Sequence, residues 1–165
     1  MKIYRLNKQQ RVPISLKTAW EFLTDPANLQ KLTPPDMAMT IVSGNDKALH
    51  EGQLLTYKVK PLPGFNTTWV SKITQVDPLV SFTDEQVKGP YALWNHQHFI
   101  TEIDGGTLMQ DVIDYAVPLG FLGQLAHPLV VKPKLEKIFA YRKEQLTSLF
   151  GEYQPEAITK HDILN

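Results

Sequence analysis

Residues 82–99 read Phe-Thr-Asp-Glu-Gln-Val-Lys-Gly-Pro-Tyr-Ala-Leu-Trp-Asn-His-Gln-His-Phe. This pattern predicts two strands joined by a turn at Gly89-Pro90. Side chains alternate between the two faces of a strand. The residues that share one face are Phe82, Asp84 and Gln86 on the first strand and Trp94, His96 and His98 on the second. An unpartnered buried polar group costs about 1–3 kcal/mol, so a plain apolar core would not hold so many. The stretch therefore predicts the wall of a cavity.

The flanking sequence predicts one curved antiparallel sheet. A first strand at 2–12 is followed by two short helices, one capped by Ser15 and the next opened by Pro26. Six further strands are expected at 37–43, 54–59, 65–76, 80–87, 94–103 and 107–117. Short turns between them favour an antiparallel meander. The chain then closes with a long helix at 135–150, whose apolar stripe is Leu135, Ile138, Phe139, Leu146, Leu149 and Phe150.

This order of one strand, two helices, six strands and one long helix is that of the helix-grip fold, in the α+β class. Only the closing helix is long enough to cover the sheet's single buried face. We expect one domain over residues 1–151 and a poorly ordered tail over 152–165. The apolar segment 118–133 should form a broken helix that bounds the cavity mouth, because Pro128 and Pro133 interrupt it.

Composition excludes several function classes. Lys plus Arg and Asp plus Glu number 17 each, so no long-range field favours nucleic acid or acidic membranes. The absence of cysteine excludes disulfides, thiol catalysis and Cys-ligated zinc. No apolar run approaches the roughly 20 residues that span a bilayer, and the first residues do not resemble a signal peptide. We therefore expect a cytoplasmic protein without an integral membrane segment.

Many positions along the chain resemble the START-like, or SRPBCC, superfamily. More narrowly, they resemble the ligand-binding SRPBCC proteins often labelled "cell division inhibitor". The matching residues are Pro13-Ile14-Ser15, 20–26, Leu29, 32–35, Phe82, Asp84, Gln86, Gly89-Pro90-Tyr91, Trp94, His96, His98, Gly106-Thr107, Asp111, Tyr115, Pro118-Leu119-Gly120, 135–139 and Tyr141-Arg142. The resemblance implies a deep cavity between the sheet and the C-terminal helix that accepts apolar or amphipathic small molecules.

The resemblance implies less about activity. The superfamily includes lipid carriers, polyketide cyclases, hormone receptors and co-chaperone-like domains, so its fold does not determine a function. It has no characteristic metal or cofactor, and we expect neither here. The cell-division label derives from relatives fused to a nucleotide-sugar epimerase-like domain. Nothing in these residues supports that label, although it makes an epimerase-like protein a candidate partner.

A hairpin register gives the sharpest chemical prediction. Asp104-Gly105 is typical of a two-residue type I′ turn, which pairs Ile103 with Gly106. His98 then lies opposite Asp111, and Trp94 lies beside Tyr115. A hydrogen bond between His98 and Asp111 would raise the histidine pKa and fix its tautomer. A three-residue loop would shift the register by one and separate the pair.

Two interpretations of this pair remain open. His98 and Asp111 could act as an acid–base pair with Tyr115 as proton donor, as cyclase, aromatase or hydratase chemistry requires. Alternatively, the two side chains could satisfy each other's hydrogen bonds at a polar end of the cavity, and we favour this structural interpretation. His96, His98 and Asp111 also have the composition of a two-His, one-carboxylate metal site. Because the superfamily has no characteristic metal, we do not predict one.

The leading hypothesis is a non-catalytic protein that binds or carries a small apolar or amphipathic molecule, as a monomer or weak dimer. The expected ligand-contacting residues are Tyr57, Phe65, Trp69, Phe82, Asp84, Gln86, Tyr91, Trp94, His96, His98, Asp111 and Tyr115. The second hypothesis is the enzyme described above, and the third is an interaction module for an epimerase-like partner. The Lys-rich segment 132–143 is interpreted as a solvated helix face.

Overall fold

The structure is a computed structural model that describes residues 1–45, 48–62 and 64–155. Its centre is a seven-stranded sheet in the order β1-β7-β6-β5-β4-β3-β2, with every neighbouring pair antiparallel. The strands are β1 (Tyr4–Val12), β2 (Thr40–Ser43), β3 (Leu54–Leu62), β4 (Phe65–Asp77), β5 (Ser81–Lys88), β6 (Leu93–Ile103) and β7 (Gly106–Ala116). The seven-stranded antiparallel sheet predicted from the sequence is thus confirmed.

Two short helices connect β1 to β2, which lie at opposite edges of the sheet. The Ser15 hydroxyl accepts the backbone N–H of Thr18 at 3.2 Å and so caps α1 (Leu16–Leu23). Asp25 caps α2 (Pro26–Lys31) in the same way. A 3₁₀ turn, η1 (Pro35–Met37), follows. Because this turn ends at Ala38 in a left-handed conformation (φ 43°), the strand expected from residue 37 begins only at Thr40.

The hairpin between β6 and β7 has the predicted two-residue loop. Ile103 pairs with Gly106, His98 with Asp111 and Trp94 with Tyr115. Gly105 has a φ of 73°, which glycine adopts without a steric penalty. Asp104 is not among the described residues with positive φ, so the turn lacks the type I′ geometry predicted, which needs positive φ at both central residues. The register on which the site prediction depended is confirmed.

The C-terminal helical segment is continuous rather than broken. It comprises α3 (Gly120–Ala126), the π-helical turn η2 (His127–Val131) and α4 (Lys132–Phe150). Pro128 cannot donate the backbone hydrogen bond that a regular α-helix needs, and it lies where the helix widens into the π-helical turn. The break expected at Pro128 and Pro133 is therefore wrong.

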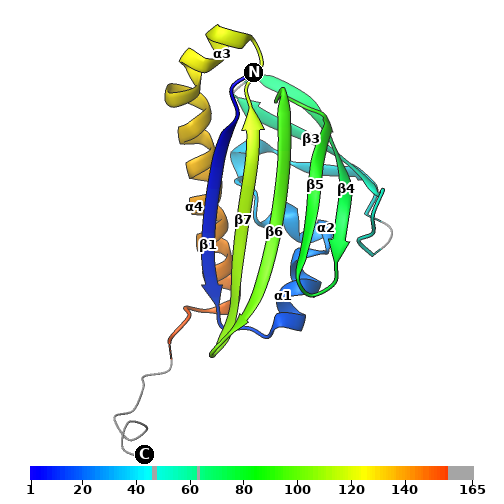
Figure 1. The fold of residues 1–165 in the computed structure, drawn as a ribbon, viewed down its shortest axis with the longest axis vertical. Coiled ribbons are helices and arrows are strands. Elements are labelled where there is room, and N and C mark those ends of the chain that lie inside the picture. The colour runs from blue at the N-terminus through cyan, green and yellow to red at the C-terminus, as the bar shows by residue number, and fades with distance from the viewer. Residues whose placement is uncertain (46–47, 63, 156–165) are drawn as a thin grey trace, which may run out of the picture.

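Helix α4 lies along the sheet, while α3 projects at one end (Figure 1). Leu146 packs in one core cluster with Val12, Ile100 and Met109, and Leu135 packs in another with Ile113 and Tyr115. This is the grip of one long helix on a curved sheet that the sequence predicted. One member of the predicted stripe differs: Leu149 is 49% exposed.

The structure describes only the first residues of the tail predicted at 152–165. Tyr153 donates its hydroxyl to the carbonyl oxygen of Asp104 at 2.7 Å, which ties the start of the tail to the β6–β7 turn. Residues 156–165 lie outside the described residues. Among the helices of the described part of the chain, none is long and apolar enough to cross a membrane.

Candidate functional site

A cavity of about 210 Å³ lies between the sheet, α1, α2 and α4. Most of its wall is apolar, and three aromatic side chains form one side. The Trp94 ring contacts Trp69 edge-on at 5.2 Å between centroids and Tyr91 at 4.7 Å. Aliphatic side chains complete the wall, namely Leu29, Leu32, Met37, Met39, Leu55 and Ile73. The cavity therefore offers a surface suited to an apolar molecule.

Four polar side chains from three adjacent strands form a buried cluster beside this wall. We call Asp84 on β5, His96 and His98 on β6, and Asp111 on β7 the His–Asp cluster. His96 Nε2 lies 2.9 Å from Asp111 Oδ1, and His98 Nε2 lies 3.1 Å from Asp84 Oδ2. In the ladders, however, His96 pairs with Asp84 and His98 pairs with Asp111. Each histidine thus bonds the carboxylate diagonal to it.

The predicted bond between His98 and Asp111 takes a different form. His98 Nδ1 lies 3.0 Å from Asp111 Oδ1, an ion-pair distance, yet this nitrogen makes no hydrogen bond within the described residues. The orientation of the His98 ring explains this, because the ring stacks on Phe82 at 4.1 Å between centroids and turns its Nε2 toward Asp84. The two-residue pair expected from sequence is therefore a four-residue network.

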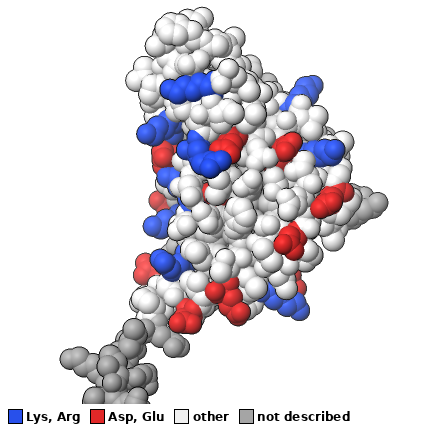
Figure 2. All heavy atoms as spheres, in the orientation of Figure 1, with Lys and Arg blue, Asp and Glu red and all other residues white. Residues whose placement is uncertain are grey.

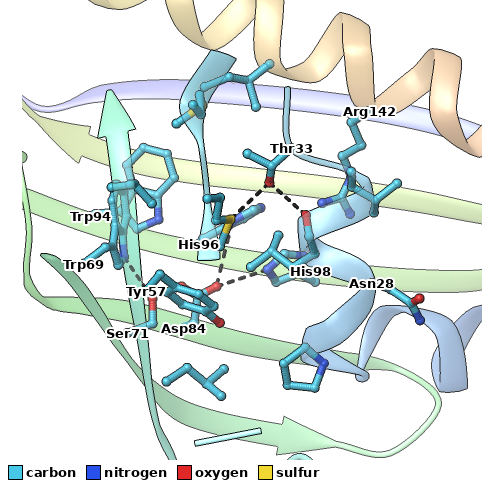
Figure 3. A pocket seen from close by; sticks show the side chains of 18 of the residues that line it. Asn28, Thr33, Tyr57, Trp69, Ser71, Asp84, Trp94, His96, His98 and Arg142 are labelled. Carbon is cyan, nitrogen blue, oxygen red and sulfur yellow. Dashed lines mark hydrogen bonds and ion pairs between the residues drawn. The ribbon is translucent and has the colours of Figure 1, made fainter. Parts of the chain in front are cut away.

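Further side chains contact the carboxylates of the cluster, and Figure 3 shows Ser71 beside Asp84 and Arg142 reaching in from α4. Arg142 reaches in from α4 and places Nη2 3.3 Å from Asp111 Oδ1. At the other end, Ser71 donates its hydroxyl to Asp84 Oδ1 at 3.0 Å and accepts the indole N–H of Trp69 at 3.0 Å. A chain of polar contacts thus runs from the aromatic wall to α4.

The carboxylates of the cluster are held ionised. Burial opposes the charge on Asp111, but Arg142 and the two histidines outweigh it and hold the pKa well below its usual range. Burial likewise opposes the charge on Asp84, and His98, His96 and Ser71 together lower its pKa. Two buried negative charges therefore need two positive partners.

The two histidines differ in protonation. Burial disfavours the charged form of His98, but Asp111 and Asp84 overcome it and raise its pKa. For His96, burial and the neighbouring charge of His98 outweigh the effect of Asp111 and Asp84, and its pKa is lowered. His98 is therefore the histidine that takes up a proton more readily, and a protonated His98 together with Arg142 would balance the two carboxylates.

Neutral His96 has its tautomer fixed by Asp111. Its Nε2–H donates to the Asp111 carboxylate, so its Nδ1 carries the free lone pair. Among the described residues that nitrogen has no hydrogen-bond partner, and Asp84 Oδ2 is 3.8 Å from it. Because His96 lines the cavity, Nδ1 is an uncharged acceptor that the cluster can offer to a bound molecule.

A metal ion would be held here by a set other than the one considered from sequence. Ligand atoms of Asp84, His96 and His98 lie within 4.8 Å of one another. A bound ion would displace the bond between His98 and Asp84. With both histidines neutral, the combined positive charge of a divalent ion and Arg142 would also exceed the combined negative charge of the two carboxylates.

The structure brings most of the predicted ligand-contacting residues to the cavity. Those that line it are Tyr57, Trp69, Phe82, Asp84, Tyr91, Trp94, His96 and His98. Burial and the Asp84 charge raise the pKa of Tyr57, and burial raises that of Tyr91, so both phenols are neutral.

Four predicted residues lie elsewhere. Phe65 begins β4 and is 52% exposed. Gln86 binds the backbone of Tyr91 at 2.8 Å and 3.2 Å, which fixes the turn instead of the cavity. Asp111 lies behind His96 and borders a second cavity between β1 and α4. The Tyr115 hydroxyl is 2.7 Å from His127 Nε2, so it is not positioned as a proton donor to the cluster.

The segment 118–133, expected at the cavity mouth, contributes none of the described lining residues. Sequence reasoning also missed Arg142 and Ser71. Arg142 is 8% exposed, which corrects the interpretation of 132–143 as a wholly solvated face. Its buried position could have been predicted from the sequence, because Arg142 falls at helical spacing with the apolar residues Leu135, Phe139 and Leu146. Ser71 lies between Trp69 and Ile73 at the strand period of two.

A curved antiparallel sheet gripped by one long helix around a cavity defines the helix-grip class of the START-like, or SRPBCC, superfamily. The profile of a family described as polyketide cyclase / dehydrase and lipid transport matches residues 12–132. Because the match spans more than half of the chain, the protein belongs to this family. A search of curated proteins gives no match.

Solved structures share the fold at low sequence identity. The Zhui aromatase/cyclase from Streptomyces sp. R1128 is 14% identical with a TM-score of 0.69, covering 90% of this chain and 93% of that one. Ms6760 from Mycobacterium smegmatis is 21% identical with a TM-score of 0.62, covering 90% and 98%. Ara h 8.0201 is 15% identical with a TM-score of 0.56, covering 89% and 99%. At these identities the likeness establishes the fold alone.

Proposed function

We propose that the protein binds an apolar or amphipathic small molecule in the cavity between the sheet and α4, without transforming it. The observation that carries this proposal is the cavity's lining. An aromatic and aliphatic wall surrounds one buried polar cluster whose charges are already balanced. Apolar contact contributes roughly 25 cal/mol per Å² buried, so affinity should come mainly from the wall.

The polar end then sets how the molecule lies. Neutral His96 offers Nδ1 as an acceptor, so the best-matched ligand carries a hydroxyl or another neutral donor at one end. A ligand carboxylate fits poorly, because Asp84 and Asp111 already supply the negative charge that Arg142 and His98 need. The family's description, which names lipid transport, agrees with a ligand of this type.

One observation favours an enzyme as second candidate. Asp111 orients His96 by a hydrogen bond while His96 faces the cavity with a lowered pKa, which is the geometry of a general base. The acid–base pair would then be His96–Asp111 instead of His98–Asp111. Against it, Tyr115 is engaged with His127, so the proton donor proposed from sequence is unavailable to the cluster.

Native mass spectrometry of the purified protein tests the binding proposal. A bound small molecule should appear as a discrete mass addition that organic extraction removes. Incubating the stripped protein with fatty alcohols of increasing chain length should restore a complex of one ligand per chain. A protein that remains ligand-free across the whole alcohol series would contradict the proposal.

A further inference from the structure

Helix α3 exposes its large apolar side chains, and its buried residue is Gly123. Phe121, Leu122 and Leu125 are 72%, 68% and 55% exposed, whereas Gly123 is buried. A Cβ at Gly123 would lie 1.9 Å from the carbonyl oxygen of Pro118, so only glycine lets the helix fold back this closely. A surface helix ordinarily turns its apolar face inward, and α3 has the opposite arrangement.

Neighbouring segments extend the apolar surface. Leu119 and Leu129, which flank α3 in the chain, are 79% and 80% exposed. The strand register brings further segments to the same end of the sheet: Tyr4 pairs with Tyr115, Leu93 with Ala116, and Leu62 with Phe65. We call this the α3 end, and its other exposed apolar residues are Ile3, Leu62 and Phe65.

The α3 end is also free of acidic residues in sequence. Residues 1–3, 59–65, 88–92 and 115–135 contain no Asp or Glu, but they contain Lys2, Lys60, Lys88, Lys132 and Lys134. Of these, Lys134 is paired with Asp36. The nearest acids in the chain are already paired, Asp114 with Arg5 and Glu136 with Lys8. In the view of Figure 2 the tip formed by α3 is uncharged or basic, and acidic side chains lie farther down.

The opposite end carries charges of both signs. Asp77, Asp104 and Glu152 lie in its turns and at the exit from α4, but Arg11 at the end of β1 and Lys17 at the start of α1 lie there as well. The excess of basic residues at the α3 end is therefore local. It would attract that end to a negatively charged surface at short range.

We propose that the α3 end docks on a lipid bilayer that contains anionic headgroups. Phe121, Leu122 and Leu125 enter the boundary between headgroups and acyl chains, and Lys2 and Lys132 contact the lipid phosphates. A bilayer suits this surface because it accepts a convex apolar tip without needing a complementary pocket. Docking involves no spanning segment and is independent of what the cavity binds.

Vesicle co-sedimentation tests this docking. Wild-type protein should sediment with vesicles of phosphatidylcholine and phosphatidylglycerol, bind pure phosphatidylcholine more weakly, and be released by salt. Leu122→Glu should lower the partition coefficient by about tenfold or more, because an exposed apolar contact becomes an acid facing acidic lipid. Lys132→Glu should weaken binding to the anionic vesicles only. The matched control is Val42→Glu, a 53% exposed residue on the far edge strand β2, which should behave as wild type.

A spectroscopic readout separates insertion from loose adsorption. The chain has no cysteine, so Leu122→Cys can be labelled uniquely with an environment-sensitive dye. The dye should shift to shorter wavelength on addition of anionic vesicles, and the same dye at Val42→Cys should not. Absence of vesicle binding at low salt, or equal binding by wild type and Leu122→Glu, overturns the proposal. A wild-type dimer that Leu122→Glu dissociates would instead assign this surface to a second copy of the chain.

Discussion

His96 and His98, neighbours on one face of β6, bond carboxylates on opposite sides of their strand. His96 Nε2 bonds Asp111 on β7 at 2.9 Å, and His98 Nε2 bonds Asp84 on β5 at 3.1 Å. Their rings lie 3.7 Å apart between centroids, which is too close for both to carry a charge at low cost. The crossed bonds therefore tie three strands together, and the short distance between the rings opposes a positive charge on both histidines at once.

Removal of one carboxylate tests this charge assignment. Asp111→Asn should lower the pKa of His98, because the variant loses one of the two charges that stabilise the imidazolium. It should also cost about 3–5 kcal/mol of folding free energy, since Arg142 becomes a buried charge without its partner. The control is Asp114→Asn, on the same strand but paired with exposed Arg5. NMR titration measures both variants, and an unchanged His98 titration in Asp111→Asn would contradict the assignment.

The grip of α4 on the sheet gives a stability prediction. Leu146 is 1% exposed within its core cluster, so Leu146→Asp should destabilise the protein by at least about 4 kcal/mol or unfold it. Leu149→Asp is the matched control on the same helix, because Leu149 is half exposed and should tolerate a charge. Thermal unfolding followed by circular dichroism distinguishes them. Similar melting of both variants would argue against the packing of α4.

The cluster should also shape the dependence of stability on pH. His96 has a lowered pKa, so its contribution is present above its unfolded value of about 6.5 and is lost as pH falls below it. The contributions of Asp84 and Asp111, whose pKa values are lowered, are lost in turn below about pH 4. His98, with a raised pKa, contributes fully below about pH 6.5 and loses that contribution at higher pH. Stability should therefore be greatest near neutral pH.

Single substitutions separate the loss of stability at acidic pH from the loss at alkaline pH. In denaturant titrations at several pH values, His96→Gln should remove the loss of stability that begins as the pH falls below about 6.5. His98→Gln should instead remove the decline on the alkaline side. A wild-type stability that does not change over this range would show that the cluster titrates alike in the folded and unfolded states.

Helical continuity does not make α3 as stable as α4. The apolar side chains of α3 are more than half exposed, whereas α4 buries Leu135 and Leu146. Hydrogen exchange should therefore be faster over 120–131 than over 135–150. Equal protection of the two segments would mean that the π-helical turn transmits the stability of α4 into α3.

Much of the fold could be predicted from local sequence signals. The Asp104-Gly105 turn determined the β6–β7 register, and the period-two pattern placed both histidines on one face. The side chains' final partners could not be predicted in this way. His98 lies directly across from Asp111, yet its ring orientation depends on stacking against Phe82 from the next strand. Such a choice depends on packing among three strands, which pairwise register does not contain.

The helical segment before α4 shows a second limit. Prolines at 128 and 133 predicted a break, because proline disrupts a regular α-helix. A π-helical turn accommodates Pro128 instead, and Pro133 lies in the first turn of α4. The sequence carries no local signal for the π-helical turn. The buried position of Arg142 was missed for a different reason. Its charge suggested solvent, while its helical phase with Leu135 and Leu146 pointed to the core.

The most direct test of a ligand-binding cavity is the affinity of an apolar fluorophore for three variants. Trp94→Ala removes the residue at the centre of the aromatic wall and should weaken binding by about tenfold or more. Phe65→Ala, which removes a half-exposed aromatic outside the cavity, should leave affinity unchanged. His98→Gln should change it by less than about threefold, since the polar cluster mainly orients the ligand. Equal affinities of wild type and Trp94→Ala, with circular dichroism showing both folded, would contradict the account.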